Sequence, residues 1–158
     1  MEITIKMLKK YKDKLKINKI QLKDNSFIQC DSTKICLADL SFLQYNETFY
    51  GKFGFSPFDE KINKKYLKNR AILQTKLVGN INLIKILNEY EEDIDDKIKD
   101  KMIHNYTKYK ETNIVQWFYK FSRKYFNADC KLMDYLVDTI YKELKLTSMK
   151  GESFILKL

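Results

Sequence analysis

Few side chains of this sequence combine the residue types and the spacing that catalysis or metal binding requires. His104 is the single histidine, and it has no metal-ligating partner at position i+3 or i+4. A transition-metal site needs clustered His, Cys or carboxylate ligands, and a Ser-His-Asp site needs a nucleophile such as the serine of G-x-S-x-G, which is absent. The acidic residues Asp93, Asp95 and Asp96 lack the central glycine of a calcium-binding loop. We therefore expect no metal site and no hydrolase chemistry, and we expect His104 at the surface.

The cysteines offer no recognisable framework either. Cys30, Cys36 and Cys130 are odd in number and include no C-x-x-C pair. Such spacing supports neither a set of disulfides nor a cysteine zinc site. We predict that all three are reduced thiols.

The basic charge of the chain is concentrated in its first half. The formal net charge is +9; residues 1–79 hold 16 basic and 8 acidic side chains, and residues 80–158 hold 14 and 13. Lysine accounts for 28 of the 30 basic residues, whereas arginine is the residue favoured for phosphate and base recognition. Four lysines share one face of the helix expected after Pro57: Lys61, Lys64, Lys65 and Lys68. This face is either a solvated surface or a site for nonspecific nucleic-acid binding, whose affinity would fall steeply with salt.

Hydropathy bounds the class of protein. No run approaches the roughly 20 apolar residues that cross a bilayer, and the N-terminal residues MEITIKMLKKYKDK lack the apolar core and cleavage site of a signal peptide. There is no internal repeat and no Gly/Ser/Pro linker. We expect one domain over residues 1–158, an intracellular location and no membrane partner.

Periodicity in the first third of the chain predicts helix, strand and helix. Apolar residues at helical spacing, among them Ile5, Leu8 and Leu15, predict an amphipathic helix over 5–16. Alternation in KINKIQLK predicts a strand over 17–23. A second helix is expected to follow caps at Asp31, Ser32 and Thr33 and to stop at Gly54.

The remainder is predicted to be helical almost to its end. A helix is expected over 81–89, and two later apolar stripes are expected to form the core: one with Ile114, Trp117, Phe118, Phe121 and Tyr125, the other with Leu132, Met133, Leu136, Val137, Ile140 and Leu144. The terminal SFILKL alternates like a strand that pairs with the strand near residue 20. The expected fold class is therefore α+β and helix-rich, with a short sheet packed on several helices.

One stretch resembles a known family. The helix, the strand KIQL and the ending FYGKFGF resemble the C-terminal half of a GNAT-type N-acetyltransferase, whose last conserved helix commonly ends in a phrase close to N-x-x-A-x-x-L-Y-E-K-x-G-F. The matching positions are Phe49, Tyr50, Lys52, Gly54 and Phe55. IQLKDNSFIQC followed by ICLADLSFLQYNETFYGKFGF is similar to uncharacterised GNAT-like proteins of large DNA viruses. The likeness covers about residues 5–58, and residues 59–158 would be a helical extension with a terminal strand.

The resemblance implies a role for Tyr50, and the sequence departs from the family pattern at several positions. In active members, a tyrosine at this position acts as the general acid toward the thiolate of coenzyme A. Leu43, Asn46 and Gly51 depart from the family pattern. The pyrophosphate-binding G-x-G loop, which lies upstream of the first helix in the family, is missing from this sequence.

Three functions are expected in order. The first is a non-enzymatic viral protein, a virion component or interaction module, built on a truncated, degenerate acetyltransferase-like half-domain without a cofactor. The second is an N-acetyltransferase that uses acetyl-CoA and is completed by a partner chain, with Tyr50 as general acid. The third is a lysine-rich nonspecific nucleic-acid-binding protein. Because a truncated sheet exposes an unpaired edge, we expect a protein partner or a homo-oligomer, in the host cytoplasm or the virion.

Overall fold

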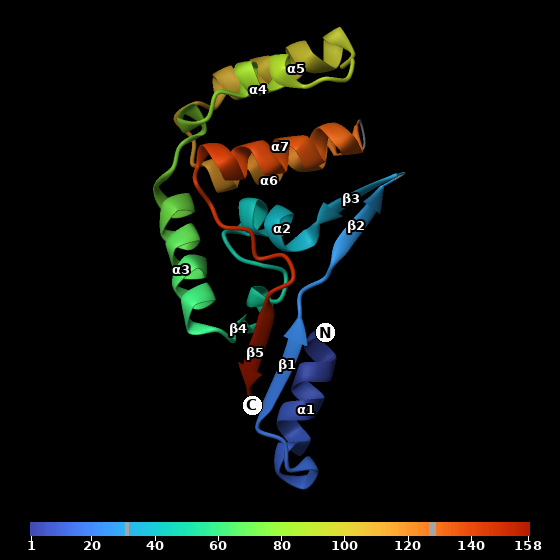
Figure 1. Ribbon diagram of the computed structural model, residues 1–158, viewed down its shortest axis with the longest axis vertical. Coiled ribbons are helices and arrows are strands. Elements are labelled where there is room, and N and C mark those ends of the chain that lie inside the picture. Colours follow the sequence, from blue (N-terminus) through green and yellow to red (C-terminus); the bar gives the residue numbers. More distant parts are fainter. Residues whose placement is uncertain (31, 127–128) are drawn as a thin grey trace.

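The computed structural model describes residues 1–30, 32–126 and 129–158. It confirms the expected helix-rich α+β class, in which helices pack on a small sheet (Figure 1). Along the described chain the elements are α1 (Glu2–Leu15), β1 (Lys19–Lys23), β2 (Phe27–Cys30), β3 (Thr33–Cys36), α2 (Leu37–Tyr45), the 3-10 turn η1 (Gly51–Phe53), β4 (Ser56–Pro57), α3 (Glu60–Thr75), the 3-10 turn η2 (Val78–Asn80), α4 (Leu83–Glu89), α5 (Asp96–Lys108), α6 (Ile114–Tyr125), α7 (Cys130–Glu143) and β5 (Ser153–Lys157).

The molecule is elongated. In Figure 1, α4 and α5 form one end, α6 and α7 lie next, α2 follows, and the sheet with α1 forms the other end. Helix α3 runs along one side. None of the helices in the described ranges is long and apolar enough to cross a membrane.

The main sheet joins the two ends of the sequence. Its strand order is β1-β5-β4, so the C-terminal strand is central. β1 and β5 are antiparallel, with Ile20 opposite Leu156 and Leu22 opposite Phe154. This register confirms the predicted pairing of the terminal strand. β4 is two residues long and contains Pro57, which suits an edge because proline cannot donate to a strand ladder.

The two predicted apolar stripes are buried on α6 and α7. The side chains of Phe118 and Phe121 on α6 and of Leu136 on α7 are almost completely inaccessible to solvent. Short helix α2 packs against both helices, and its residues 38–43 are all buried. The core is thus built where periodicity predicted it, with α2 as an additional inner element.

The chain after residue 30 differs from the prediction. Thr33–Cys36 is a strand paired with Phe27–Cys30 in a hairpin, whereas the sequence predicted helix caps there. Ile35 is fully buried, and alternating burial with a β-branched residue favours the strand. Asp31, one of the predicted caps, lies outside the described residues.

The predicted helix end near Gly54 is also corrected. Helix α2 ends at Tyr45, because Asn46 adopts a left-handed conformation with φ of 57°. The family-like stretch is therefore the 3-10 turn η1 followed by β4, not the end of α2. Gly54 does terminate η1, at φ of 86°, where glycine is favoured because it has no Cβ.

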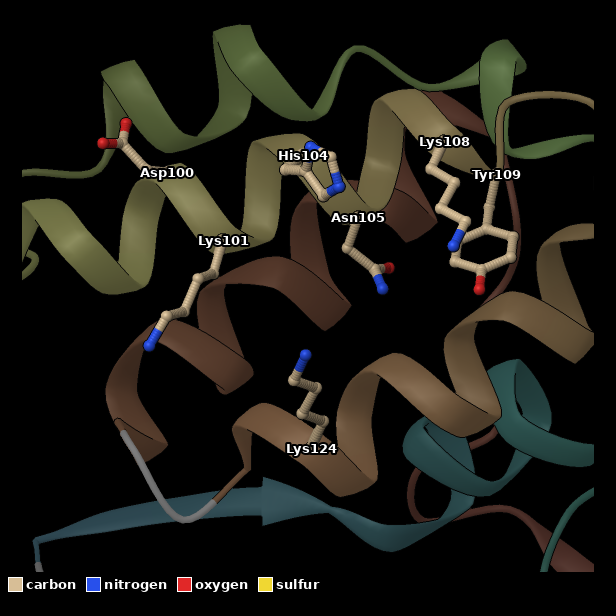
Figure 2. Close-up of a pocket in the computed structure, with 7 residues that line it drawn as sticks. All are labelled: Asp100, Lys101, His104, Asn105, Lys108, Tyr109 and Lys124. Atoms are coloured by element: carbon tan, nitrogen blue, oxygen red, sulfur yellow. The ribbon is translucent and has the colours of Figure 1, made fainter.

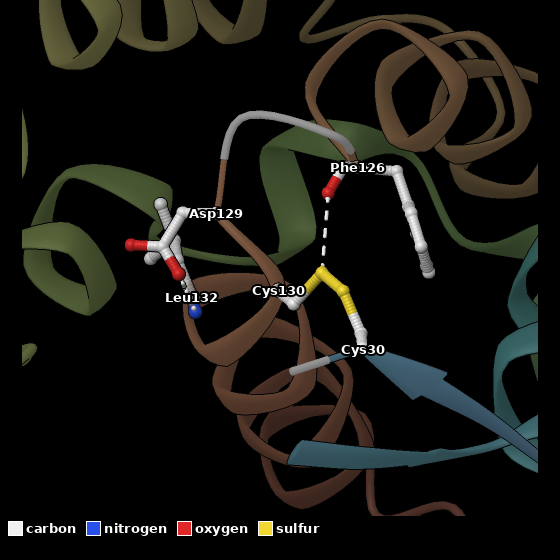
Figure 3. Close-up of a disulfide and its surroundings, with 5 residues drawn as sticks. All are labelled: Cys30, Phe126, Asp129, Cys130 and Leu132. Carbon is white, nitrogen blue, oxygen red and sulfur yellow. Dashed lines mark hydrogen bonds between the residues drawn. A yellow bond between two sulfur atoms is a disulfide. The ribbon is translucent and has the colours of Figure 1, made fainter. Parts of the chain in front are cut away.

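The structure contains a disulfide, so the prediction of three reduced thiols was wrong for two of them. Cys30 at the end of β2 is bonded to Cys130 at the start of α7, with 6.0 Å between their Cα atoms (Figure 3). Cys36 remains a free thiol. The two bonded cysteines are 100 residues apart in sequence, and only the packing of the hairpin against α7 brings them together.

Polar side chains fix the segment that connects α7 to β5. Asn69 on α3 donates to the Thr147 carbonyl at 2.7 Å and accepts from the Thr147 N–H at 3.0 Å. The buried Asp39 carboxylate accepts from the Ser148 hydroxyl at 2.6 Å and from the Met149 N–H at 3.1 Å. These bonds fix the segment before β5, which lies at the centre of the sheet.

Candidate functional site

Helices α5 and α6 are held at fixed positions by polar contacts at their ends. Asn113 caps α6 by accepting from the Val115 N–H at 3.0 Å, and its amide donates to the Leu73 carbonyl at the end of α3 at 3.0 Å. The buried Tyr106 hydroxyl of α5 donates to the Ile81 carbonyl at 2.7 Å. These contacts fix both helices relative to the neighbouring elements.

A hydrogen bond between side chains connects the two helices directly. The indole Nε1 of Trp117 on α6 donates to Oδ1 of Asn105 on α5 at 2.8 Å. Trp117 is 2% exposed, so this bond satisfies the polar edge of a buried ring, as buried tryptophan requires. Trp117 and Asn105 both line the space between α5 and α6.

That space is an open groove, which we call the α5–α6 groove. It comprises two adjoining hollows of about 460 Å³ and about 310 Å³ that share Asn105, Tyr109 and Lys124. Its remaining lining residues are Asp100, Lys101, His104, Lys108, Thr112, Gln116, Trp117 and Lys120. The groove is thus lined by α5, α6 and the turn between them.

The groove is strongly basic. Four lysines line it, Lys101 and Lys108 on α5 and Lys120 and Lys124 on α6. Asp100 is the single carboxylate among the lining residues, and in Figure 2 it points away from the gap that Lys101 and Lys124 face. In the described part of the chain, none of the four lysines forms an ion pair. Lys108 Nζ lies 5.4 Å from the ring centroid of Tyr109, and Lys124 Nζ lies 5.2 Å from that of Tyr125. These ring contacts do not neutralise the positive charges, which an anionic ligand would still meet.

Two rings accompany the lysines. Tyr109 is 37% exposed, and His104 is exposed on α5, as the sequence predicted. Both side chains line the same hollow as Lys101 and Lys108 (Figure 2). An exposed aromatic beside unpaired lysines is a combination that binds both the bases and the backbone of a single nucleic-acid strand.

The structure places the four lysines predicted from sequence elsewhere. Lys61, Lys64, Lys65 and Lys68 are all exposed on α3, on a convex helix rather than in the groove. Lys64 lies 3.8 Å from Glu60 in an exposed ion pair. The groove lysines were missed because α5 and α6 each contribute only part of the set, and neither helix alone carries a conspicuous cluster.

Tyr50, the predicted catalytic candidate, lies in an aromatic cluster beside the sheet. Its ring centroid is 5.4 Å from that of Phe49, 6.1 Å from that of Phe55 and 6.5 Å from that of Phe154. Burial, together with the Asp24 carboxylate, raises the pKa of the Tyr50 phenol above its usual value. The phenol therefore keeps its proton at neutral pH, which a general acid and a packed ring equally require.

The backbone around Tyr50 does not form a phosphate cradle. The N–H groups of residues 51–55 all donate within the segment, to Thr48 Oγ1, or to the carbonyls of Thr48, Tyr50 and Gly51. A pyrophosphate site needs such groups unpaired and convergent. The residues of this turn thus do not fit the phosphate-binding part of acetyl-CoA.

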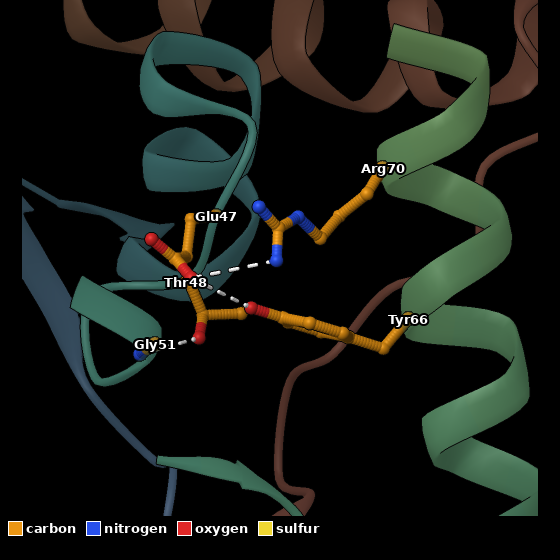
Figure 4. A network of polar contacts seen from close by, with 5 residues as sticks. All are labelled: Glu47, Thr48, Gly51, Tyr66 and Arg70. Atoms are coloured by element: carbon orange, nitrogen blue, oxygen red, sulfur yellow. Dashed lines mark hydrogen bonds and ion pairs between the residues drawn. The ribbon is translucent and has the colours of Figure 1, made fainter. Parts of the chain in front are cut away.

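Crowding explains the glycine at position 51. A Cβ at Gly51 would lie 2.5 Å from Glu47 Cγ and 2.7 Å from the Tyr66 hydroxyl. Tyr66 donates to Glu47 at 3.3 Å, and Arg70 pairs with the same carboxylate at 3.8 Å (Figure 4). The turn is therefore packed tightly against α3.

Asp95, one of the acidic residues considered for a cation site, has a structural role. The Asp95 carboxylate accepts from the Ile98 N–H at 3.1 Å and caps α5. Among the described residues, no group of three or more His, Cys, Asp or Glu side chains could hold a metal ion.

Comparison of the chain with protein-family models, with curated proteins and with solved structures finds no match. The α5–α6 groove is accordingly interpreted from its own residues.

Proposed function

We propose that this chain is a non-enzymatic interaction module that binds single-stranded nucleic acid in the α5–α6 groove. The observation that carries the proposal is that four lysines from two helices line one groove, and none of them forms an ion pair within the described part of the chain. Lysines that face a common concavity reinforce one another's field, because low-dielectric walls focus it. A polyanion would be attracted electrostatically by all four lysines at once.

The accompanying side chains favour a single strand over other anions. Tyr109 is 37% exposed, and Lys108 Nζ lies over its ring at 5.4 Å from the centroid, so a base would stack on the ring surface that Lys108 leaves open. Base stacking on an aromatic side chain is independent of sequence. Lysine is a compact charge without the planar fork by which arginine reads bases. The proposed binding is therefore nonspecific in sequence and sensitive to salt.

The test compares two matched pairs of lysines. Lys120→Ala/Lys124→Ala removes two charges from the groove, and Lys61→Ala/Lys65→Ala removes two exposed charges at the same helical spacing from α3. Binding of a fluorescent single-stranded oligonucleotide, followed by anisotropy across salt concentrations, should weaken by about tenfold in the groove variant only. The slope of log K against log salt should fall in magnitude by about 1.4, or about 0.7 for each lost contact.

The fluorescence of Trp117 reports whether the oligonucleotide binds in the groove. It is the only tryptophan of the sequence and lines the groove, so a ligand bound there should change the intrinsic fluorescence. Equal weakening in both lysine variants without a tryptophan signal would indicate binding by overall charge and would contradict the groove. Loss in the α3 variant alone would support the site first predicted from sequence.

The wider expectations from the sequence stay predictions. An interaction module is in keeping with a virion component on a degenerate GNAT-like fold, and the disulfide favours the virion over the host cytoplasm, because disulfides are rare in a reducing cytosol. The acetyltransferase alternative depends on Tyr50, and calorimetric binding of acetyl-CoA is the measurement that bears on it.

A further inference from the structure

Helix α1 exposes a row of large apolar side chains. Ile3, Met7 and Leu15 are 77%, 57% and 54% exposed, and with Tyr11 they recur every four residues along the 14-residue helix. Residues spaced by four lie on one face of a helix. Exposed apolar residues scattered singly are ordinary, but a contiguous row is the mark of an interaction surface.

The row points away from the rest of the molecule. Ile5 is the only buried residue of α1, and it lies two positions from both Ile3 and Met7, which puts it on a different side of the helix. α1 also occupies one end of the elongated molecule, beside β1 (Figure 1). The helix is thus attached by one side and presents its apolar row to the outside.

Lysines border this row. Lys10 and Lys14, which are both exposed, follow one side of it. Residues 1–23 contain eight lysines and two acidic residues, and Lys19 and Lys23 continue the exposed basic charge onto β1. An apolar face bordered by lysines is the pattern of a helix that lies in the plane of an anionic membrane surface.

We propose that α1 docks this protein on an anionic lipid surface, with the row from Ile3 to Leu15 inserted among the acyl chains and its lysines at the headgroups. A nucleic acid would satisfy the lysines but leave the apolar row in water. A second copy of α1 would bring like charges together. A protein groove that encloses the helix would compete with the attachment through Ile5, whereas a flat surface needs only the free side.

This inference is independent of the α5–α6 groove, and it departs from the expectation of no membrane partner. That expectation followed from the lack of a spanning segment, and α1 would lie on the surface without crossing it. The chemistry required of the partner is an anionic headgroup above an apolar layer.

The test uses the full chain and two vesicle compositions. Sedimentation with vesicles of phosphatidylcholine alone and of phosphatidylcholine mixed with phosphatidylserine should show binding to the anionic vesicles only. Met7→Glu should weaken that binding by about tenfold or more, because it places a charge where an apolar side chain would be inserted.

Leu67→Glu is the matched control, since Leu67 is 53% exposed on another helix, α3, and the charge change is identical. It should bind vesicles like the original chain, and both variants should keep their circular dichroism spectrum and their oligonucleotide affinity. Equal effects of the two substitutions, or no binding to anionic vesicles at low salt, would overturn the proposal. If the chain does not bind vesicles but forms a dimer in light scattering, and Met7→Glu abolishes that dimer, the apolar row is a dimer interface and the proposal is overturned.

Discussion

Asp24 is a buried carboxylate whose Oδ2 has no hydrogen-bond partner among the described residues. Burial raises its pKa above the usual 3.8, against the hydrogen bonds from Ser26. Because the folded pKa is raised, this group's contribution to stability is present below pH 3.8 and is lost as pH rises through the folded value.

Asp24→Asn should therefore increase the free energy of unfolding by about 1 kcal/mol at pH 7 and flatten its acid dependence. Urea unfolding across pH tests this, with exposed Asp93→Asn as control; a destabilised Asp24→Asn would refute it.

At the scale of the element, the disulfide ties the β2–β3 hairpin to α7 and closes a loop of about 100 residues. Constraint of the unfolded chain by such a loop typically stabilises a protein by about 2–4 kcal/mol. Cys130→Ser should lose that amount and become insensitive to dithiothreitol, whereas Cys36→Ser should keep the full response to the reductant. Denaturant unfolding with and without reductant measures both. The oxidised protein should also expose one thiol to titration on unfolding, and a count of three would refute the bond.

At the scale of the whole molecule, β5 is the strand on which distant parts of the chain meet. The ring of Phe154 is fully buried, and its centroid lies 6.4 Å from that of Tyr66 on α3 and 6.5 Å from that of Tyr50. In the sheet, Phe154 is opposite Leu22 of β1 and Pro57 of β4. Phe154→Ala should destabilise the protein by about 3–5 kcal/mol, as burial of a phenylalanine implies. Phe58→Ala is the control, because Phe58 is 55% exposed. A single cooperative calorimetric transition at a lower temperature is expected, and similar stabilities of the two variants would contradict this view of β5.

The groove and the apolar row differ in how far the sequence could reveal them. The helical spacing of Tyr11 and Leu15 was visible in the sequence, and α1 formed close to the predicted range. Periodicity identifies an apolar face but does not say what covers it. In the structure the predicted face divides, because Ile5 is buried and Leu8 half-buried whereas Tyr11 and Leu15 are exposed in line with Ile3 and Met7.

Properties that depend on neighbours along the chain could be predicted from the amino-acid sequence: the amphipathic stripes of α6 and α7, the alternation that pairs β1 with β5, and the lack of a spanning segment in the described ranges. Tertiary structure decided what depends on distant residues. It made Thr33–Cys36 a strand, joined Cys30 to Cys130 and gathered lysines of α5 and α6 around one groove. The physical reason is that local periodicity sets which side of an element is apolar, whereas packing of the whole chain sets which sides meet.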